Sequence, residues 1–116
     1  MQNSSDSIFK VVPRELWEAA TSGEFNGSPV DEQDGYIHFS SRTQVRETVA
    51  KHFHGQNDLL IVTVDSTRLG ESLVWEASRG GDLFPHLYGP LPHSAVICVQ
   101  DLPVGPDGHH TFPTDI

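Results

Sequence analysis

The chain has 116 residues, with 16 Asp and Glu against 7 Lys and Arg, so its formal net charge is −9. This length suits one compact domain, and the acidic excess excludes a broad duplex-binding surface, which needs many basic side chains on phosphates. The chain is 36% hydrophobic, and it contains no apolar run near the ~20 residues that span a bilayer. We therefore expect a globular cytoplasmic protein that has no contact with a membrane.

The first quarter of the chain predicts a strand, a helix and a loop. Residues 8–12 are rich in β-formers and predict a first strand, preceded by a disordered leader over residues 1–7. Pro13 suits the start of a helix, which Gly23 then ends. Residues 23–35 are rich in Gly, Pro, Asn and Asp, so they predict a long loop, a feature that often carries function.

The next two elements are a strand and a helix. Strict alternation over residues 36–40 predicts a strand whose apolar side chains, Ile37 and Phe39, face the core. Ser41 is a good N-cap for a helix over about residues 42–54. The buried stripe of this helix repeats every four residues. It consists of Val45, Val49 and Phe53.

The second half of the chain is rich in strands. Strands are predicted over residues 59–64, 73–77, 86–88 and 94–100. Residues 106–108, Pro-Asp-Gly, are a tight-turn signature that would fold residues 109–112 back as a hairpin. Two early helices packed on mixed or antiparallel sheets thus predict one α+β domain over residues 8–112, followed by a tail over residues 113–116.

The first candidate site motif covers residues 34–41, Asp-Gly-Tyr-Ile-His-Phe-Ser-Ser. Strand alternation would place Tyr36, His38 and Ser40 on one face. There the aromatic ring can stack on a ligand, while the imidazole and the hydroxyl hydrogen-bond it. A solvated sheet face with a polar stripe fits the same residues, and this segment alone does not separate the two interpretations.

The second motif covers residues 75–81, Trp-Glu-Ala-Ser-Arg-Gly-Gly. On a strand, Glu76 could hydrogen-bond a ribose hydroxyl or act as a base. Arg79 precedes two glycines and could clamp a phosphate while backbone amides approach it. An exposed turn with an ordinary ion pair is the alternative interpretation of this motif.

The third motif covers residues 84–92, which combine aromatic, imidazole and proline residues. If the segment is extended, His86 and Tyr88 alternate onto one face, where they would form the rim of a cleft; a packed aromatic loop is the alternative. The chain has seven histidines, but none shows the spacing of a zinc motif, so we expect no metal site.

Together, residues 34–40, 75–81 and 84–88 resemble a bacterial family filed as domain of unknown function 952. The resemblance extends from about Ile8 to Phe112, and it implies a small α+β domain of the ADP-ribosyltransferase-like fold. Proteins of that superfamily bind NAD in a cleft between two small sheets. The resemblance therefore implies NAD as a substrate, with no covalently bound cofactor.

The same resemblance suggests roles for individual residues. His38 resembles the early-strand histidine that contacts the ribose, and Ser40 resembles a nearby hydroxyl. Glu76 is the best match for the catalytic glutamate, although it comes earlier in the strand order than the superfamily pattern. The aromatic residue against the nicotinamide is matched equally by Tyr36 and Tyr88.

Two hypotheses follow for the function. In the first, the protein is an enzyme, or a degenerate relative of one, that binds NAD or a related phosphorylated nucleotide in a cleft. In the second, it is a non-catalytic small-ligand or protein-interaction module on the same fold. Catalysis is favoured if Glu76 points into the same cleft as His38. The candidate catalytic residues are Glu76 and His38, and the candidate ligand-binding residues are Tyr36, His38, Ser40, Arg79, His86 and Tyr88.

Overall fold

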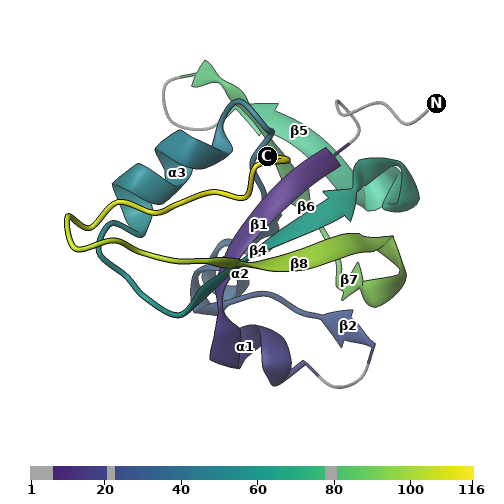
Figure 1. The fold of residues 1–116 in the computed structure, drawn as a ribbon. Coiled ribbons are helices and arrows are strands. Elements are labelled where there is room, and N and C mark those ends of the chain that lie inside the picture. The colour runs from purple at the N-terminus through teal and green to yellow at the C-terminus, as the bar shows by residue number, and fades with distance from the viewer. Residues whose placement is uncertain (1–6, 21–22, 78–80) are drawn as a thin grey trace.

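The structure is a computed structural model that describes residues 7–20, 23–77 and 81–116. It is an α+β fold of small antiparallel sheets and short helices (Figure 1). This arrangement confirms the predicted α+β class. No described helix is long and apolar enough to cross a membrane.

A three-stranded antiparallel sheet runs through the centre of the fold. Its strands are β1 (Ser7–Pro13), β4 (Leu59–Asp65) and β8 (Val96–Leu102), in the order β1-β4-β8. Val62 of β4 lies opposite Lys10 on one side and Val99 on the other. The first six residues of β4 are buried, which confirms the central strand predicted from its apolar run.

A second antiparallel sheet carries most of the candidate site. It consists of β3 (Ile37–His38), β6 (Leu83–Leu87) and β5 (Leu73–Ala77), in the order β3-β6-β5. His38 lies opposite His86, and Val74 of β5 lies opposite His86 on its other side. The predicted strand over residues 86–88 is therefore displaced toward the N-terminus, because β6 begins at Leu83 and ends at Leu87.

The three described α-helices are short. They are α1 (Arg14–Glu18), α2 (Pro29–Asp34) and α3 (Val45–His52). The prediction of a loop over residues 23–35 was wrong, because this segment contains α2 and strand β2 (Glu24–Phe25), which pairs with β7 (Leu91–Pro92). Ser28 and Asp31 form a capping box that starts α2, and Gly35 ends it with a φ of +89°. A six-residue helix is too short to show an apolar period.

Two apolar cores lie on opposite faces of the central sheet. The first fills the space between that sheet and the second sheet, and it includes Val62 of β4 and Leu87 of β6. The second lies under α3 and contains Ile61 of β4. In α3 the predicted stripe is confirmed, since Val45 and Val49 are buried and Phe53 packs beside them; the helix itself begins later than predicted.

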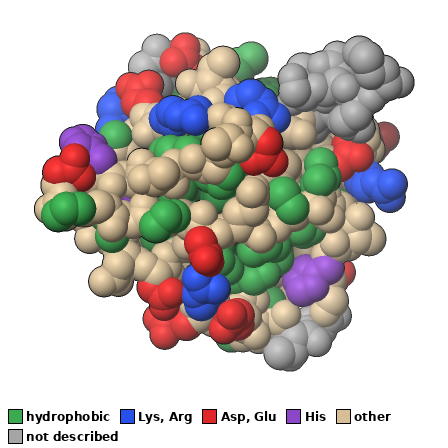
Figure 2. Space-filling model, in the orientation of Figure 1, with side chains coloured by type: hydrophobic (Ala, Val, Ile, Leu, Met, Phe, Trp, Pro, Cys, Tyr) green, Lys and Arg blue, Asp and Glu red, His purple; other side chains and the backbone are tan. Residues whose placement is uncertain are grey.

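The two ends of the chain differ from the predicted boundaries. Residues 1–6 of the expected leader lie outside the described residues, whereas Ser7 already belongs to β1 and is buried. At the other end, Val104 pairs with His110 in the expected fold-back. The last residues lie against α3 and the turn before it, because Arg46 Nη2 of α3 donates to the Ile116 oxygen at 2.8 Å and Arg42 Nη1 donates to the Asp115 carbonyl at 2.7 Å. Figure 2 shows that acidic side chains are spread over the face in view.

Candidate functional site

The first and third sequence motifs meet at the pairing of β3 with β6. Tyr36 stacks on His86, with ring centroids 4.1 Å apart and an interplanar angle of 24°. Tyr36 also contacts His38 at 4.7 Å and Tyr88 at 5.2 Å, and the two imidazole rings lie 5.6 Å apart. We call Tyr36, His38, His86 and Tyr88 the aromatic–imidazole cluster. Its four rings come from two segments that the antiparallel register places side by side.

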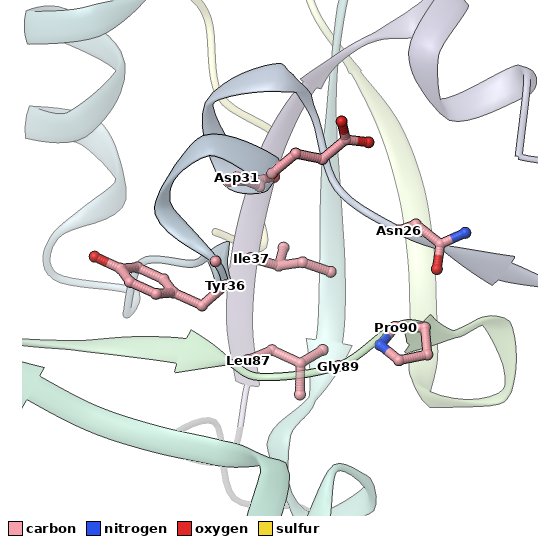
Figure 3. A pocket seen from close by; sticks show the side chains of 9 residues that line it. Asn26, Asp31, Tyr36, Ile37, Leu87, Gly89 and Pro90 are labelled. Carbon is pink, nitrogen blue, oxygen red and sulfur yellow. The ribbon is translucent and has the colours of Figure 1, made fainter.

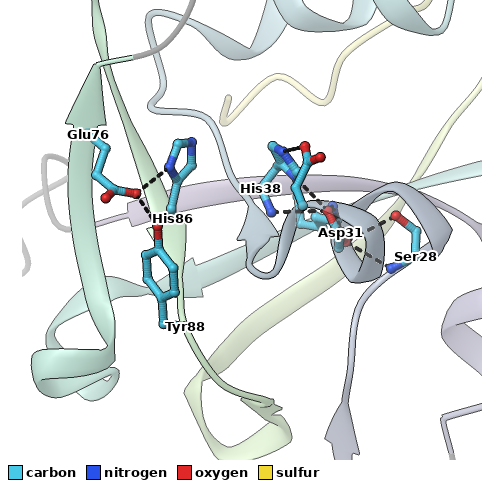
Figure 4. A network of polar contacts seen from close by, with 8 residues as sticks. Ser28, Asp31, His38, Glu76, His86 and Tyr88 are labelled. Carbon is cyan, nitrogen blue, oxygen red and sulfur yellow. Dashed lines mark hydrogen bonds and ion pairs between the residues drawn. The ribbon is translucent and has the colours of Figure 1, made fainter.

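Glu76 joins this cluster from the second motif. Its Oε1 accepts hydrogen bonds from His86 Nδ1 at 2.8 Å and from the Tyr88 hydroxyl at 2.7 Å (Figure 4). These two hydrogen bonds lower the pKa of Glu76. The bond from Tyr88 has the larger effect, and the bond from His86 has the smaller one. The hydrogen bond to Glu76 in turn raises the pKa of Tyr88 to about 12. The carboxylate is therefore an ionised acceptor that faces the same cluster as His38.

A second carboxylate, Asp31 of α2, orients His38. Asp31 Oδ1 accepts hydrogen bonds from the His38 ring Nδ1 at 2.6 Å and from the His38 backbone N–H at 3.2 Å (Figure 4). Its Oδ2 lies 2.8 Å from Lys10 Nζ and accepts the Ser28 N–H at 2.8 Å. Because a carboxylate only accepts, the proton on the His38 ring is held at Nδ1.

Lys10 and Asp31 form a buried ion pair beneath the cluster. Lys10 is 5% exposed and Asp31 is 2% exposed. Burial lowers the pKa of Lys10, and the charge and hydrogen bond of Asp31 only partly offset this effect. Burial by itself would raise the pKa of Asp31, but hydrogen bonds and charge from His38 and Lys10 outweigh it, so the pKa ends well below its usual range. The Asp31 carboxylate is thus ionised at neutral pH, and it lies 2.8 Å from Lys10 Nζ.

Sequence reasoning missed both residues, although each left a signal. Lys10 is a charged residue at an otherwise apolar position of a predicted strand, where burial requires an opposite charge. Asp31 lies three residues after Ser28, the spacing of a capping box. Neither signal identifies the partner, because the ion pair joins β1 to α2 across the core.

The second ring nitrogen of His38 faces a third carboxylate. Nε2 lies 2.9 Å from Asp34 Oδ2, at the end of α2. A ring that carries protons on both nitrogens donates to Asp31 and Asp34 together. The two ring nitrogens of His38 therefore face two different carboxylates, with Nε2 on the more exposed side of the ring.

An open pocket of about 180 Å³ lies beside the cluster (Figure 3). Its lining residues are Asn26, Asp31, Glu32, Gly35, Tyr36, Ile37, Leu87, Gly89 and Pro90. Typical small-molecule sites have roughly 300 Å³ or more, so this pocket has room for one ring system. Among the described residues, its lining includes Glu32 and the Asp31 carboxylate that Lys10 neutralises, and it has no Lys or Arg. This lining favours a neutral or cationic group.

The structure brings together five of the predicted site residues and leaves Ser40 apart. Glu76 and the aromatic–imidazole cluster are in contact, as described above. Ser40 is buried, and its hydroxyl donates to Thr48 Oγ1 at 3.0 Å. The expected common face fails at this residue because β3 ends at His38, after which Ser40 turns to pair with Phe9 of β1. Arg79 lies outside the described residues. Within the described ranges, no group of three His, Cys, Asp or Glu side chains is arranged to hold a metal.

Comparison with known proteins identifies the family. The profile of a family described as "Protein of unknown function (DUF952)" matches residues 11–99. The crystal structure of protein CC0527 from Caulobacter crescentus is 48% identical, with a TM-score of 0.86 over 90% of this chain and 93% of that chain. The solution structure of CC0527 is 49% identical, with a TM-score of 0.79 over 89% and 90%. No curated protein matches the chain. The chain therefore belongs to the DUF952 family.

Proposed function

We propose that the aromatic–imidazole cluster and Glu76 bind NAD or a related phosphorylated nucleotide by its ring-and-ribose end. The observation that supports this proposal most directly is the position of Glu76, whose carboxylate hydrogen-bonds His86 within the ring cluster that contains His38. Three motifs that are separate in the sequence thus supply one set of stacking rings and hydrogen-bonding groups. The resemblance to ADP-ribosyltransferase-like proteins adds NAD as the nucleotide.

The charges around the pocket suggest which end of the nucleotide binds there. Asp31 lines the pocket, but its charge is neutralised by Lys10. Glu32 also lines the pocket, and Asp34 and Glu76 lie at the cluster. Such carboxylates attract a positively charged ring and repel a diphosphate. The nicotinamide ring of NAD is cationic, and a single ring fits about 180 Å³. The diphosphate is proposed to lie outside this acidic pocket, with Arg79 as its proposed partner.

Each residue has a proposed role that its position supports. Tyr36, whose ring already stacks on His86, would stack against the base. The two hydrogen bonds that described residues make to the Glu76 carboxylate both go to Oε1, and Oε2 is proposed to accept the ribose hydroxyls. His38, held by Asp31 at Nδ1, would donate a hydrogen bond from Nε2 to the ligand in place of its contact with Asp34. In a transfer reaction Glu76 would also stabilise positive charge that develops on the ribose.

Thermal shift with millimolar NAD tests binding, because a ligand that binds only the folded chain raises its melting temperature. We expect NAD to stabilise the wild type and the control Glu71→Gln, which changes an exposed glutamate that is not part of the cluster. We expect Glu76→Gln and Tyr36→Ala to lose most of this shift. No shift in the wild type, or equal shifts in all four proteins, would overturn the proposal.

The second candidate function is a non-catalytic module that binds a small ligand, and the pocket volume favours it. About 180 Å³ is too small for a whole dinucleotide, but it accommodates a single ring with a positive or neutral group. Mass spectrometry of NAD incubations separates the two candidates. Release of nicotinamide that depends on Glu76 supports the enzyme, whereas nicotinamide binding without any turnover of NAD supports the module.

A further inference from the structure

We propose a second binding site, for a small organic anion with an apolar body, between α3 and the C-terminal segment. The site is an open pocket of about 220 Å³. It is lined by Arg46, Val49, Ala50, His54, Gly108, His109, His110 and Phe112. We call it the α3 pocket. It borders the apolar core on the opposite face of the central sheet from the core beneath the aromatic–imidazole cluster, and it shares no lining residue with the first pocket.

The lining of the α3 pocket contrasts in charge with the rest of the chain. The whole sequence has a net charge of −9, with only 7 Lys and Arg and 7 His. The described residues that line the pocket nevertheless combine one arginine with three histidines and include no Asp or Glu. Guanidinium and imidazole groups donate hydrogen bonds to carboxylate or phosphate oxygens. An anion is therefore the class of ligand that this lining recognises.

The basic groups are held in place by the fold. The guanidinium of Arg46 lies over the ring of Phe112, 4.7 Å from its centroid, and Nη2 donates to the Ile116 oxygen at 2.8 Å. His110 Nε2 lies 2.7 Å from the Gln56 carbonyl, which ties the C-terminal segment to the end of α3. Preorganised groups lose little conformational freedom when a ligand binds.

The turn before His109 completes one wall of the pocket. Gly108 has a φ of +86°, and a Cβ at this position would lie 2.5 Å from His54 Nε2. The absence of a side chain therefore lets the His54 ring approach the turn and meet His109, at 5.1 Å between ring centroids. Figure 1 shows α3 and the yellow C-terminal segment running along the same side of the molecule.

One carboxylate, Asp107, lies close to this wall without lining the pocket. Its Oδ1 accepts the His109 backbone N–H at 3.0 Å. That bond, together with nearby His109 and His54, lowers the pKa of Asp107. Asp107 thus remains an anion that is engaged by the turn, and Arg46 is the one Lys or Arg among the described residues that line the pocket.

The apolar part of the lining narrows the ligand class. Val49, Ala50 and the Phe112 ring form walls, which favour a ligand with a short aliphatic or aromatic body over a bare ion. A carboxylate and a phosphate monoester share the required anionic oxygens. The experiment therefore compares benzoate, phenyl phosphate and inorganic phosphate.

NMR titration of the ¹⁵N-labelled protein tests this site. We expect benzoate or phenyl phosphate to shift the amide signals of residues 46–50 and 108–112 at millimolar concentration, and inorganic phosphate to bind more weakly. Arg46→Gln should weaken binding about tenfold, as expected for the loss of a hydrogen bond to a charged group. Arg68→Gln is the matched control, since Arg68 pairs with Asp65 elsewhere.

Arg46 also packs on Phe112, so Arg46→Gln can lose binding through a folding defect alone. A second variant therefore tests the site without changing Arg46. His109→Gln keeps the arginine and should weaken binding of the same anions. Glu76→Gln should leave these affinities unchanged, so failure of the nucleotide proposal does not affect this test. The proposal is overturned if neither organic anion shifts these signals, if Arg46→Gln and His109→Gln bind as the wild type does, or if benzylamine binds as tightly as benzoate.

Discussion

His86 is clamped between two groups from different motifs, because the Tyr36 ring stacks on its face at 4.1 Å and Glu76 holds its Nδ1 at 2.8 Å. The stack to Tyr36 depends on the pairing of β3 with β6, in which His38 lies opposite His86. The hydrogen bond depends on the pairing of β6 with β5. His86, 4% exposed, is thus oriented by both neighbours of its strand.

Replacing Glu76 should change the titration of Tyr88. The hydrogen bond to Glu76 is the main cause that raises the pKa of Tyr88 to about 12, so Glu76→Gln should lower this pKa toward the ordinary value of about 10. Phenolate absorbance as a function of pH measures it. The chain has two tyrosines, and the Tyr36→Phe background isolates Tyr88.

Glu71→Gln in the same background is the control for this titration. Glu71 is exposed in a 3₁₀ turn, so its loss should leave the pKa of Tyr88 unchanged. An unchanged Tyr88 titration in Glu76→Gln would contradict the hydrogen bond that joins the second and third motifs.

Breaking the buried ion pair should destabilise the fold strongly. Asp31→Asn removes the negative charge 2.8 Å from Lys10 Nζ and leaves a buried ammonium without its charged partner. Such a change costs about 3–5 kcal/mol of unfolding free energy, which urea denaturation measures. The double variant Lys10→Met/Asp31→Asn should recover part of the loss, and a loss of under about 1 kcal/mol in Asp31→Asn would contradict the burial of the pair.

The contribution of Asp31 should depend on pH with a defined sign. Its folded-state pKa lies below the unfolded value of 3.8, so its contribution is present above about pH 4 and is lost as the pH falls further. The difference in unfolding free energy between the wild type and Asp31→Asn should therefore be constant near neutral pH and shrink below about pH 4. Urea midpoints at several acidic pH values check this, and a difference that grows in acid would give the opposite sign.

Ser40 should act through stability, not through the cluster. Its hydroxyl donates to Thr48 in α3, so Ser40→Ala should cost about 1 kcal/mol of unfolding free energy. Any ligand affinity measured at the aromatic–imidazole cluster should be unchanged. Thr48→Val should cost a similar amount, because it removes the partner of the same bond. If Ser40→Ala lost the thermal shift with NAD while its stability stayed unchanged, Ser40 would be a ligand-binding residue and this prediction would be wrong.

The main elements were predictable where the local pattern is long. The apolar run of β4 and the four-residue period of α3 reveal burial directly, and both predictions hold. The short elements were not, because α2 and β2 are too brief to show a period and are stabilised by a capping box and by pairing with β7. The prediction that Ser40 shares a face with Tyr36 and His38 was wrong for a similar reason, because the chain leaves β3 after His38 and Ser40 pairs with Phe9.

By itself, the sequence determined the α+β class, the positions of the long strands along the chain, and the residue types of the three motifs. Only the tertiary structure decided that Tyr36, His86 and Glu76 meet, and that Lys10 neutralises Asp31 beneath His38. The physical reason is the range of the interactions. Side-chain periodicity is local along the chain, whereas strand register and a buried ion pair join residues that are distant in sequence and adjacent only after the core has formed.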